Sequence, residues 1–245
     1  MLVIYIFGAA VACFLIYVVF LAICSLFVNP GKEYSEHSNF YRVLLNSATL
    51  LAMKIVRVHV KVYGMENVPT NVKPLFVGNH VSNYDPIVTW YVFKKWKPAF
   101  VSKTANFKIP VFGRIIRKCC FMEIDRENPR NAIKTICNAA ELLKKQDVSV
   151  GVYPEGTRSK SCKLLPFHNG VFKIAQKANA PLVVVHISET EKIYKNIPWK
   201  HTDVQIKVVD VMSAEELASM RSEEIGKRVR EALEKEGKSV WNSIL

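Results

Sequence analysis

The feature that most constrains this chain is an apolar run at its N-terminus. From Leu2 to Val28 the side chains are almost unbroken in apolar character, and the first charged side chain is Lys32. A helix needs about 20 apolar residues to cross the hydrocarbon layer of a membrane, and a helix with no polar face is a poor fit to a buried core position. The run is also too long for a signal peptide and lacks a basic flank. We therefore expect a membrane-anchoring helix here.

A second apolar segment, from Phe40 to Val58, follows after a turn. Its apolar residues recur at helical spacing, and it carries three cations, Arg42, Lys54 and Arg57. Such a helix can lie in the membrane interface with its cations at the lipid headgroups. Two geometries stay open, because the first helix can span the bilayer or the two helices can form a hairpin embedded in one leaflet.

The remaining sequence indicates an α/β domain, which divides the chain into membrane-anchoring helices at 1–58 and the α/β domain at 59–245. Short apolar or alternating runs, typical of strands, recur between amphipathic segments, and this alternation predicts a mixed, largely parallel sheet flanked by helices. The expected strands are 58–63, 75–78, 120–124, 148–153, 181–187 and 204–209. Helices are expected at 85–93, in two pieces within 105–118, and at 131–144 and 170–178, with a last one that starts at a Ser213–Glu216 capping box.

The charge balance indicates an anionic partner. The formal net charge is +13, which favours an anionic membrane surface or a phosphorylated substrate. Nucleic acid is the weakest candidate, because the sequence has no recognition-helix pattern, no zinc-finger spacing and no interleaved basic and aromatic run. An excess of cations beside an anchor predicts the cytoplasmic face of the membrane. The six cysteines form no C-x-x-C pair, so we expect neither a disulfide framework nor a metal site.

A polar stretch, Asn79 to Pro86, begins where the expected strand 75–78 ends. Ligands of open α/β sheets bind at the carboxyl ends of strands. His80 and Asp85 lie five residues apart across a turn, so the carboxylate can reach the imidazole, fix its tautomer and leave the other ring nitrogen to accept a proton. Asp85 and Pro86 also match an N-cap and a first helical position. A plain local turn is the alternative for this stretch taken alone.

Four blocks between about Lys61 and Ile187 together resemble the glycerolipid acyltransferases, most closely the 1-acylglycerol-3-phosphate acyltransferases. They are the N-H-x-x-x-x-D block at 79–85, a second block from 109 to 126, the Y-P-E-G-T-R-S block at 153–159, and a looser fourth at 181–185. The family usually has Phe where Tyr153 stands, and this chain has His168-Asn169 where the family often has lysines. None of these departures removes a catalytic group.

The resemblance implies roles for particular residues. His80 and Asp85 would be the catalytic dyad. The glycerol phosphate would be bound by Arg126 of the second block and by residues of the third block, namely Glu155, Gly156, Thr157 and Arg158.

Physical chemistry supports these roles for the cations. Arg126 and Arg158 each follow a strand end, and a guanidinium suits a phosphate better than an ammonium does. Lys103 is a further candidate, although a solvated lysine is as good an interpretation. Glu155 would repel a phosphate, so we expect it to orient Arg158 or to bind the glycerol hydroxyl.

The implied reaction is transfer of a fatty acyl group from a thioester, acyl-CoA or acyl carrier protein, to the 2-hydroxyl of 1-acylglycerol 3-phosphate (lysophosphatidic acid), giving phosphatidic acid. No cofactor is implied beyond the acyl donor. His80 would deprotonate the acceptor hydroxyl, so no acyl-enzyme is required, and Ser82 lacks the G-x-S-x-G context of a nucleophile. Backbone amides near Gly156 or after His80 would bind the oxyanion. The alternatives are acylation of glycerol 3-phosphate or another lysophospholipid, and a non-catalytic module that binds anionic lipid.

Overall fold

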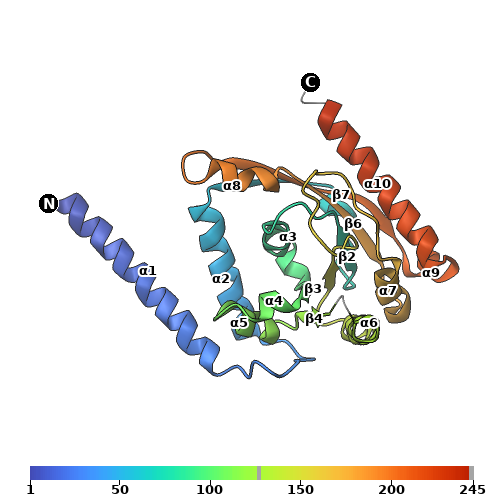
Figure 1. Cartoon of the computed structure of the whole chain (residues 1–245), viewed down its shortest axis with the longest axis horizontal. Coiled ribbons are helices and arrows are strands. Elements are labelled where there is room, and N and C mark those ends of the chain that lie inside the picture. Colours follow the sequence, from blue (N-terminus) through green and yellow to red (C-terminus); the bar gives the residue numbers. More distant parts are fainter. Residues whose placement is uncertain (126–127, 243–245) are drawn as a thin grey trace.

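In the computed structural model, which describes residues 1–125 and 128–242, a seven-stranded sheet lies between two layers of helices (Figure 1). The strand order is β1-β7-β6-β2-β5-β3-β4. Five neighbouring pairs are parallel, and β6 with β7 is antiparallel, so β1 and β7 run opposite to the other five strands. The expected mixed, largely parallel sheet is confirmed. The strands are β1 Val58–Tyr63, β2 Leu75–Gly78, β3 Ala99–Lys103, β4 Met122–Ile124, β5 Val150–Val152, β6 Leu182–Ser188 and β7 Thr202–Met212.

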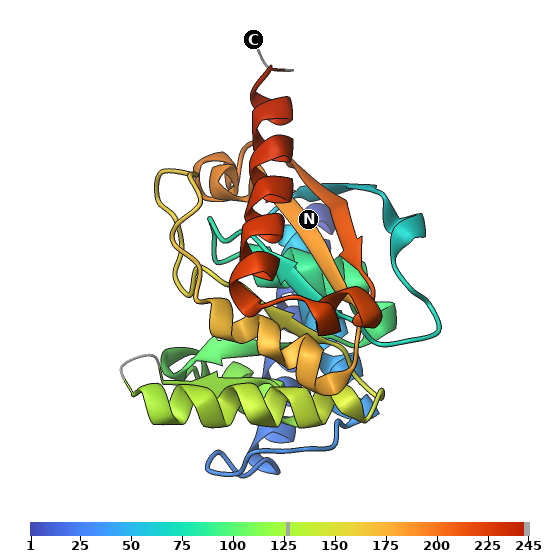
Figure 2. The same ribbon diagram turned by 90° about the vertical axis from the view of Figure 1, so that its right-hand side faces the viewer.

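Helices cover both faces of this sheet, as the turned view in Figure 2 also shows. On one face Leu75 and Val77 of β2 pack in a core with α6 (Pro129–Lys144), α7 (Lys173–Ala178) and α10 (Ser222–Asn242). On the other face Phe76 packs with residues of α2 (Asn39–Ile55), α3 (Asp85–Phe93) and α8 (Ile193–Asn196). Strands buried on both faces are apolar at successive positions, which is why 75–78 and 181–187 were readable as strands.

Most expected elements form with small shifts at their ends. The two helices expected within 105–118 are α4 (Thr104–Phe107) and α5 (Phe112–Lys118). Ser213 caps α9 (Ala214–Ser219) in the expected capping box with Glu216, but the terminal helical segment is broken into α9 and α10. Strand β3 was not predicted, because its apolar run of Ala99, Phe100 and Val101 is short and gives way at once to Ser102 and Lys103.

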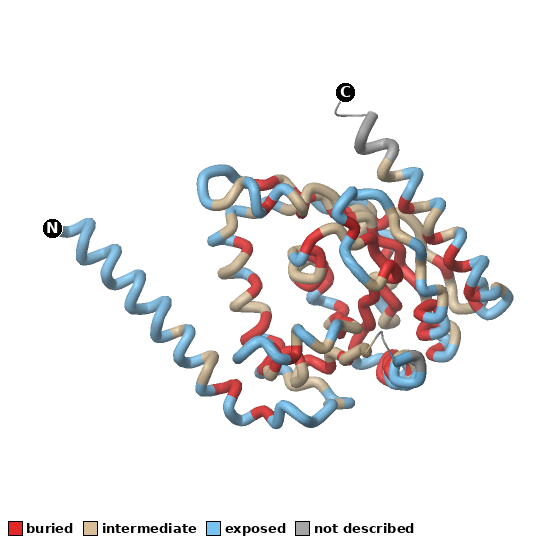
Figure 3. The backbone as a smooth tube through the Cα atoms, in the orientation of Figure 1, coloured by how far each residue is buried: buried red, intermediate tan, exposed pale blue. Residues whose placement is uncertain are grey.

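Helix α1 (Leu2–Leu26) leads away from the α/β domain, and its side chains are exposed along most of its length (Figure 3). Within the described residues it is the one helix long and apolar enough to cross a membrane by length and composition. Two hydrogen bonds tie its second half to α2: the Tyr17 hydroxyl lies 2.7 Å from Ser47 Oγ, and the Tyr41 hydroxyl donates to the Cys24 carbonyl over 2.9 Å. Most of the apolar surface of α1 is therefore exposed.

Helix α2 is instead packed against the α/β domain through a buried face that includes Leu44, Leu45 and Met53. The expectation that its cations reach lipid headgroups is wrong for Arg42, which is buried. Its guanidinium donates to the carbonyls of Pro98 and Cys119 at 3.3 and 3.0 Å, which gives the buried charge hydrogen-bond partners. Lys54 and Arg57 are exposed.

The sheet brings one set of chain segments to a common edge. Strands β2, β5 and β6 end there, and the start of β7 lies at the same edge because Ser188 at the end of β6 pairs with Gln205. The start of β1 joins them, since Val58 pairs with Thr202 of β7. Polar segments that follow β2, β5 and β6 therefore meet at this edge.

Candidate active site

His80 and Asp85 form a hydrogen-bonded pair at the carboxyl end of β2. His80 Nδ1 lies 2.8 Å from Asp85 Oδ2, with the Asp85 side chain fully buried and the His80 side chain 16% exposed. An ionised carboxylate can only accept, so Nδ1 carries the proton and Nε2 presents a lone pair. Within the described residues Nε2 has no hydrogen-bond partner, so this nitrogen is available to take a proton from a bound hydroxyl.

The carboxylate of Asp85 is fixed from four directions. Besides His80 Nδ1, Oδ2 accepts from the backbone amides of Val81 and Ser82 at 2.7 and 2.8 Å. The other oxygen, Oδ1, accepts from the hydroxyl of Thr190, which is completely buried. Asp85 is the first residue of α3 rather than its expected N-cap, which is Tyr84. The side chain therefore closes the turn before the helix and holds the imidazole in one orientation.

Residues of the 153–159 loop form hydrogen bonds with the backbone of His80. Glu155 Oε1 accepts from His80 N at 2.8 Å, and Ser159 N donates to His80 O at 2.8 Å. Glu155 Oε2 accepts from Leu165 N at 2.9 Å. Burial raises the pKa of Glu155, and the two amide donors partly offset that rise. The first and third sequence blocks thus lie side by side, and Glu155 is engaged with backbone amides rather than turned toward Arg158.

Tyr153 supports the imidazole ring itself. The two rings stack with centroids 4.5 Å apart and planes 22° apart. The Tyr153 hydroxyl lies 3.1 Å from Thr89 Oγ1, which gives the tyrosine a partner that phenylalanine would not have. Burial, with the negative charge of Asp85, raises the pKa of Tyr153 well above its ordinary value, so the phenol stays neutral.

Other possible nucleophiles are occupied or protonated. Ser82 is buried and its hydroxyl accepts from Tyr84 N at 3.2 Å, so it is a turn-forming residue. Burial raises the pKa of Cys119 to about 12 and of Cys120 to about 11. A thiol with such a pKa carries almost no thiolate at neutral pH. Among these four side chains, His80 is the one that presents an unengaged atom within the described residues.

The expected phosphate-binding residues form a more open side of the site. Thr157 and Arg158 are exposed on the loop that holds His80, and neither side chain has a partner among the described residues. Gly156 lies between them and Glu155 with a positive φ of 69°. Lys103 is exposed at the end of β3. Arg126 lies outside the described residues.

An apolar pocket of about 140 Å³ opens beside this loop. Tyr153, Pro154 and Gly156 form one side of it, and Ala132 and Ile136 of α6 form another. Such a pocket is suited to an alkyl chain, because burying methylene groups is favourable by about 0.8 kcal/mol each. The structure therefore places an apolar recess, a proton acceptor and exposed cations around one sheet edge.

Two contacts of the site were not anticipated from the sequence. Thr190 follows β6 and lies far from Asp85 along the chain, and no local motif links the two residues. Asn79 ties the carboxyl end of β2 to β6, since its side chain donates to Ile187 O and accepts from Ile187 N, both at 2.8 Å. A polar residue that ends a buried strand was the only available signal for Asn79.

Comparisons with known proteins identify the family of the chain. A family model described as Acyltransferase matches residues 59–188. The chain is 37% identical over 133 residues to the chloroplastic 1-acyl-sn-glycerol-3-phosphate acyltransferase BAT2 of Brassica napus, an alignment that covers 54% of this chain and 38% of that protein. It is 30% identical over 138 residues to the 1-acyl-sn-glycerol-3-phosphate acyltransferase of Haemophilus influenzae, covering 56% and 57%. The chain thus matches about half the length of such relatives, or less.

A solved structure shares the fold. The crystal structure of the 1-acyl-sn-glycerophosphate acyltransferase of Thermotoga maritima superposes with a TM-score of 0.69 at 24% sequence identity, covering 92% of this chain and 88% of that one. The superposition confirms the α/β architecture. The resemblance carried by the four sequence blocks is confirmed by the family model and by the named relatives.

Proposed function

Because the chain belongs to the acyltransferase family, whose model matches residues 59–188, we propose that it transfers a fatty acyl group from a thioester to the 2-hydroxyl of 1-acylglycerol 3-phosphate, giving phosphatidic acid. The donor is acyl-CoA or acyl carrier protein. The observation that carries the proposal is the hydrogen bond of 2.8 Å between His80 Nδ1 and Asp85 Oδ2, with no partner for Nε2 among the residues that the structure describes.

In this mechanism His80 acts as general base on the acceptor. As the hydroxyl oxygen attacks the thioester carbonyl, its proton moves to Nε2, and Asp85 stabilises the imidazolium that forms. The tetrahedral intermediate then collapses, the carbon–sulfur bond breaks, and the proton passes from His80 to the departing thiolate. The proton of the alcohol therefore ends on the free thiol, and no covalent acyl-enzyme forms.

The oxyanion of that intermediate needs free hydrogen-bond donors. The amides of Val81 and Ser82 already donate to Asp85, and Gly156 N already donates to Tyr153 O. Along the 156–159 loop the amides of Thr157 and Arg158 remain without a partner in the described part of the chain. We assign the oxyanion to these two amides, and the acceptor phosphate to the guanidinium of Arg158 with Arg126 and Lys103.

The remaining groups complete the assignment. Thr190 positions Asp85, and Glu155 positions His80 by holding its amide. The apolar pocket beside Tyr153 and Gly156 takes part of an acyl chain.

The N-terminal helix supplies the membrane part of the proposal. Helix α1 is apolar along almost its whole length and exposes its apolar side chains, which suits an anchor. We place the domain from residue 59 on the cytoplasmic face, beside an anionic lipid surface that attracts the net charge of +13. Protease protection in sealed vesicles tests this orientation, because a domain on that face is cleaved only from the cytoplasmic side.

A matrix of donors and acceptors with the detergent-solubilised full chain tests the function. Free thiol release should be greatest with lysophosphatidic acid and smaller with glycerol 3-phosphate or lysophosphatidylcholine. A preference for either of the other acceptors would reassign the acceptor within the same chemistry. Absence of acceptor-dependent thiol release from both acyl-CoA and acyl carrier protein would contradict the enzyme and favour a lipid-binding module.

A further inference from the structure

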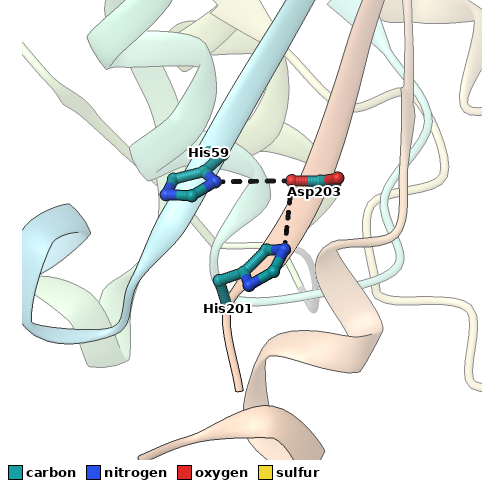
Figure 4. Close-up of side chains that lie close together, drawn as sticks. All are labelled: His59, His201 and Asp203. Carbon is teal, nitrogen blue, oxygen red and sulfur yellow. Dashed lines mark ion pairs between the residues drawn. The ribbon is translucent and has the colours of Figure 1, made fainter.

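A second group of titratable side chains lies outside the catalytic dyad, at the first residues of β1 and β7. His59 of β1 and Asp203 of β7 are direct partners in the parallel pairing of the two strands. His201 precedes Asp203 by two residues, which brings its side chain to the same face of the sheet. Figure 4 shows the two imidazoles directed toward the carboxylate from two sides.

The spacing of these three groups matches that of ligands around one ion. Asp203 Oδ1 lies 3.5 Å from His59 Nδ1 and 3.9 Å from His201 Nε2. One ligand atom from each residue lies within 4.8 Å of the other two. Ligands about 2.0–2.1 Å from a tetrahedral zinc ion are separated by roughly 3.3 Å, so small side-chain rotations would bring all three to bonding distance.

The two oxygens of Asp203 have different neighbours. Oδ2 accepts from Lys61 Nζ at 3.3 Å, whereas Oδ1 faces the histidines. The carboxylate can therefore bind an ion through Oδ1 while Oδ2 keeps its lysine.

The side chains are accessible to an ion from solvent. Exposed fractions are 67% for His59, 54% for His201 and 42% for Asp203. The imidazole rings stack with centroids 5.0 Å apart, so they already lie side by side. Two imidazole nitrogens with one carboxylate oxygen favour zinc or a similar transition metal over magnesium or calcium, which prefer all-oxygen sites.

We propose that His59, His201 and Asp203 bind a divalent transition-metal ion, best Zn²⁺, with water as the fourth ligand. The ion would join the start of β1 to the start of β7. The segment that leads into β7 from β6 carries Thr190, which donates to Asp85. A bound ion would thus hold one end of the segment that supports the dyad, without contacting the dyad itself.

Calorimetric titration of the untagged full chain in detergent with ZnCl₂ tests the proposal. Thiols are first blocked with N-ethylmaleimide, because Cys13 and Cys162 are exposed and would bind zinc. The expected result is one saturable site per chain and a higher melting temperature with zinc. The variants His59→Ala and His201→Ala should each weaken zinc binding by about tenfold or more, since loss of an outer-sphere partner alone costs that much.

Further variants separate a metal site from general zinc adsorption. His168→Ala, which removes another exposed histidine, should leave the zinc isotherm unchanged. Lys61→Ala should tighten zinc binding a few fold, because it removes a positive charge beside the ligand carboxylate. All four variants should melt like the wild type without zinc, because the residues are exposed. Absence of a saturable site, or wild-type affinity in both His59→Ala and His201→Ala, would overturn the proposal.

Discussion

The two sides of the proposed active site are built in opposite ways. On the dyad side Asp85 is fully buried and bonded to four donors, and the backbone of His80 is held at both its amide and its carbonyl. On the phosphate side Thr157, Arg158 and Lys103 are exposed, and their side chains have no partner in the part of the chain that the structure describes. The proposed chemistry is thus placed on a support with many hydrogen bonds, while the proposed recognition of the acceptor uses exposed side chains.

This contrast has a physical reason. A general base must be held close to its productive geometry, because small misplacements cost a large part of its effect. A phosphate carries its charge over several oxygens and attracts cations from several directions, so long exposed side chains suit it. Variants on the dyad side should therefore change kcat, and variants on the phosphate side should change KM.

The largest effect is expected for His80→Ala. Removing the general base should lower kcat by about 1,000-fold, while the half-buried position lets the variant fold. Steady-state kinetics of acyl transfer to lysophosphatidic acid measure this loss. Activity within tenfold of the wild type, in a protein with an unchanged melting temperature, would remove His80 from the mechanism.

Glu155→Ala tests whether the hydrogen bonds from backbone amides to Glu155 stabilise the fold around His80. The substitution leaves the amides of His80 and Leu165 without their acceptor, at a cost of about 3 kcal/mol in the free energy of unfolding. For a chain of this size that corresponds to a fall of roughly 6–12 °C in melting temperature. Glu141→Ala, on the exposed face of α6, is the matched control and should melt like the wild type. An unchanged melting temperature for Glu155→Ala would contradict the structural role.

Thr190→Val removes one of the four donors to Asp85 while keeping the shape of the side chain. A hydrogen bond to a charged group contributes about 2 kcal/mol, so kcat should fall by roughly 30-fold with KM for lysophosphatidic acid unchanged. Thr190→Ser should restore most of the activity because it returns the hydroxyl. Equal losses in Thr190→Val and Thr190→Ser would show that the methyl group, not the hydrogen bond, matters at this position.

Arg158→Ala should have the smallest effect and the opposite kinetic signature. Loss of one guanidinium–phosphate contact should raise KM for lysophosphatidic acid by about tenfold and leave kcat nearly unchanged. Arg221→Ala removes another exposed arginine, which lies just before α10, and serves as the control. A lower kcat with an unchanged KM in Arg158→Ala would mean that the two sides of the site are not divided as described.

The same contrast explains which features were readable from the sequence. His80 and Asp85 lie five residues apart, so their contact depends on one local turn and could be predicted. Strands buried on both faces, such as 75–78, leave a continuous apolar run and were also found. These features are set by neighbours along the chain.

Features set by distant residues were missed. The bond from Thr190 to Asp85 depends on β6 lying beside β2, and nothing near Thr190 in the sequence indicates that pairing. Arg42 looked like an interfacial cation because its segment is apolar, whereas its guanidinium caps two carbonyls that only tertiary packing brings to it. Strand β3 was missed because its apolar run is short. It forms as a strand by pairing with β5 and β4, and this pairing between distant segments cannot be read from the local sequence.

The most direct test of the central claim, that His80 delivers the acceptor hydroxyl straight to the thioester, is rapid-mixing measurement of thiol release from acyl-CoA. The account predicts no release by the wild type without lysophosphatidic acid, prompt release when it is added, and almost none from His80→Ala with it. A burst of thiol equal to the enzyme concentration without any acceptor would reveal an acyl-enzyme and contradict the account.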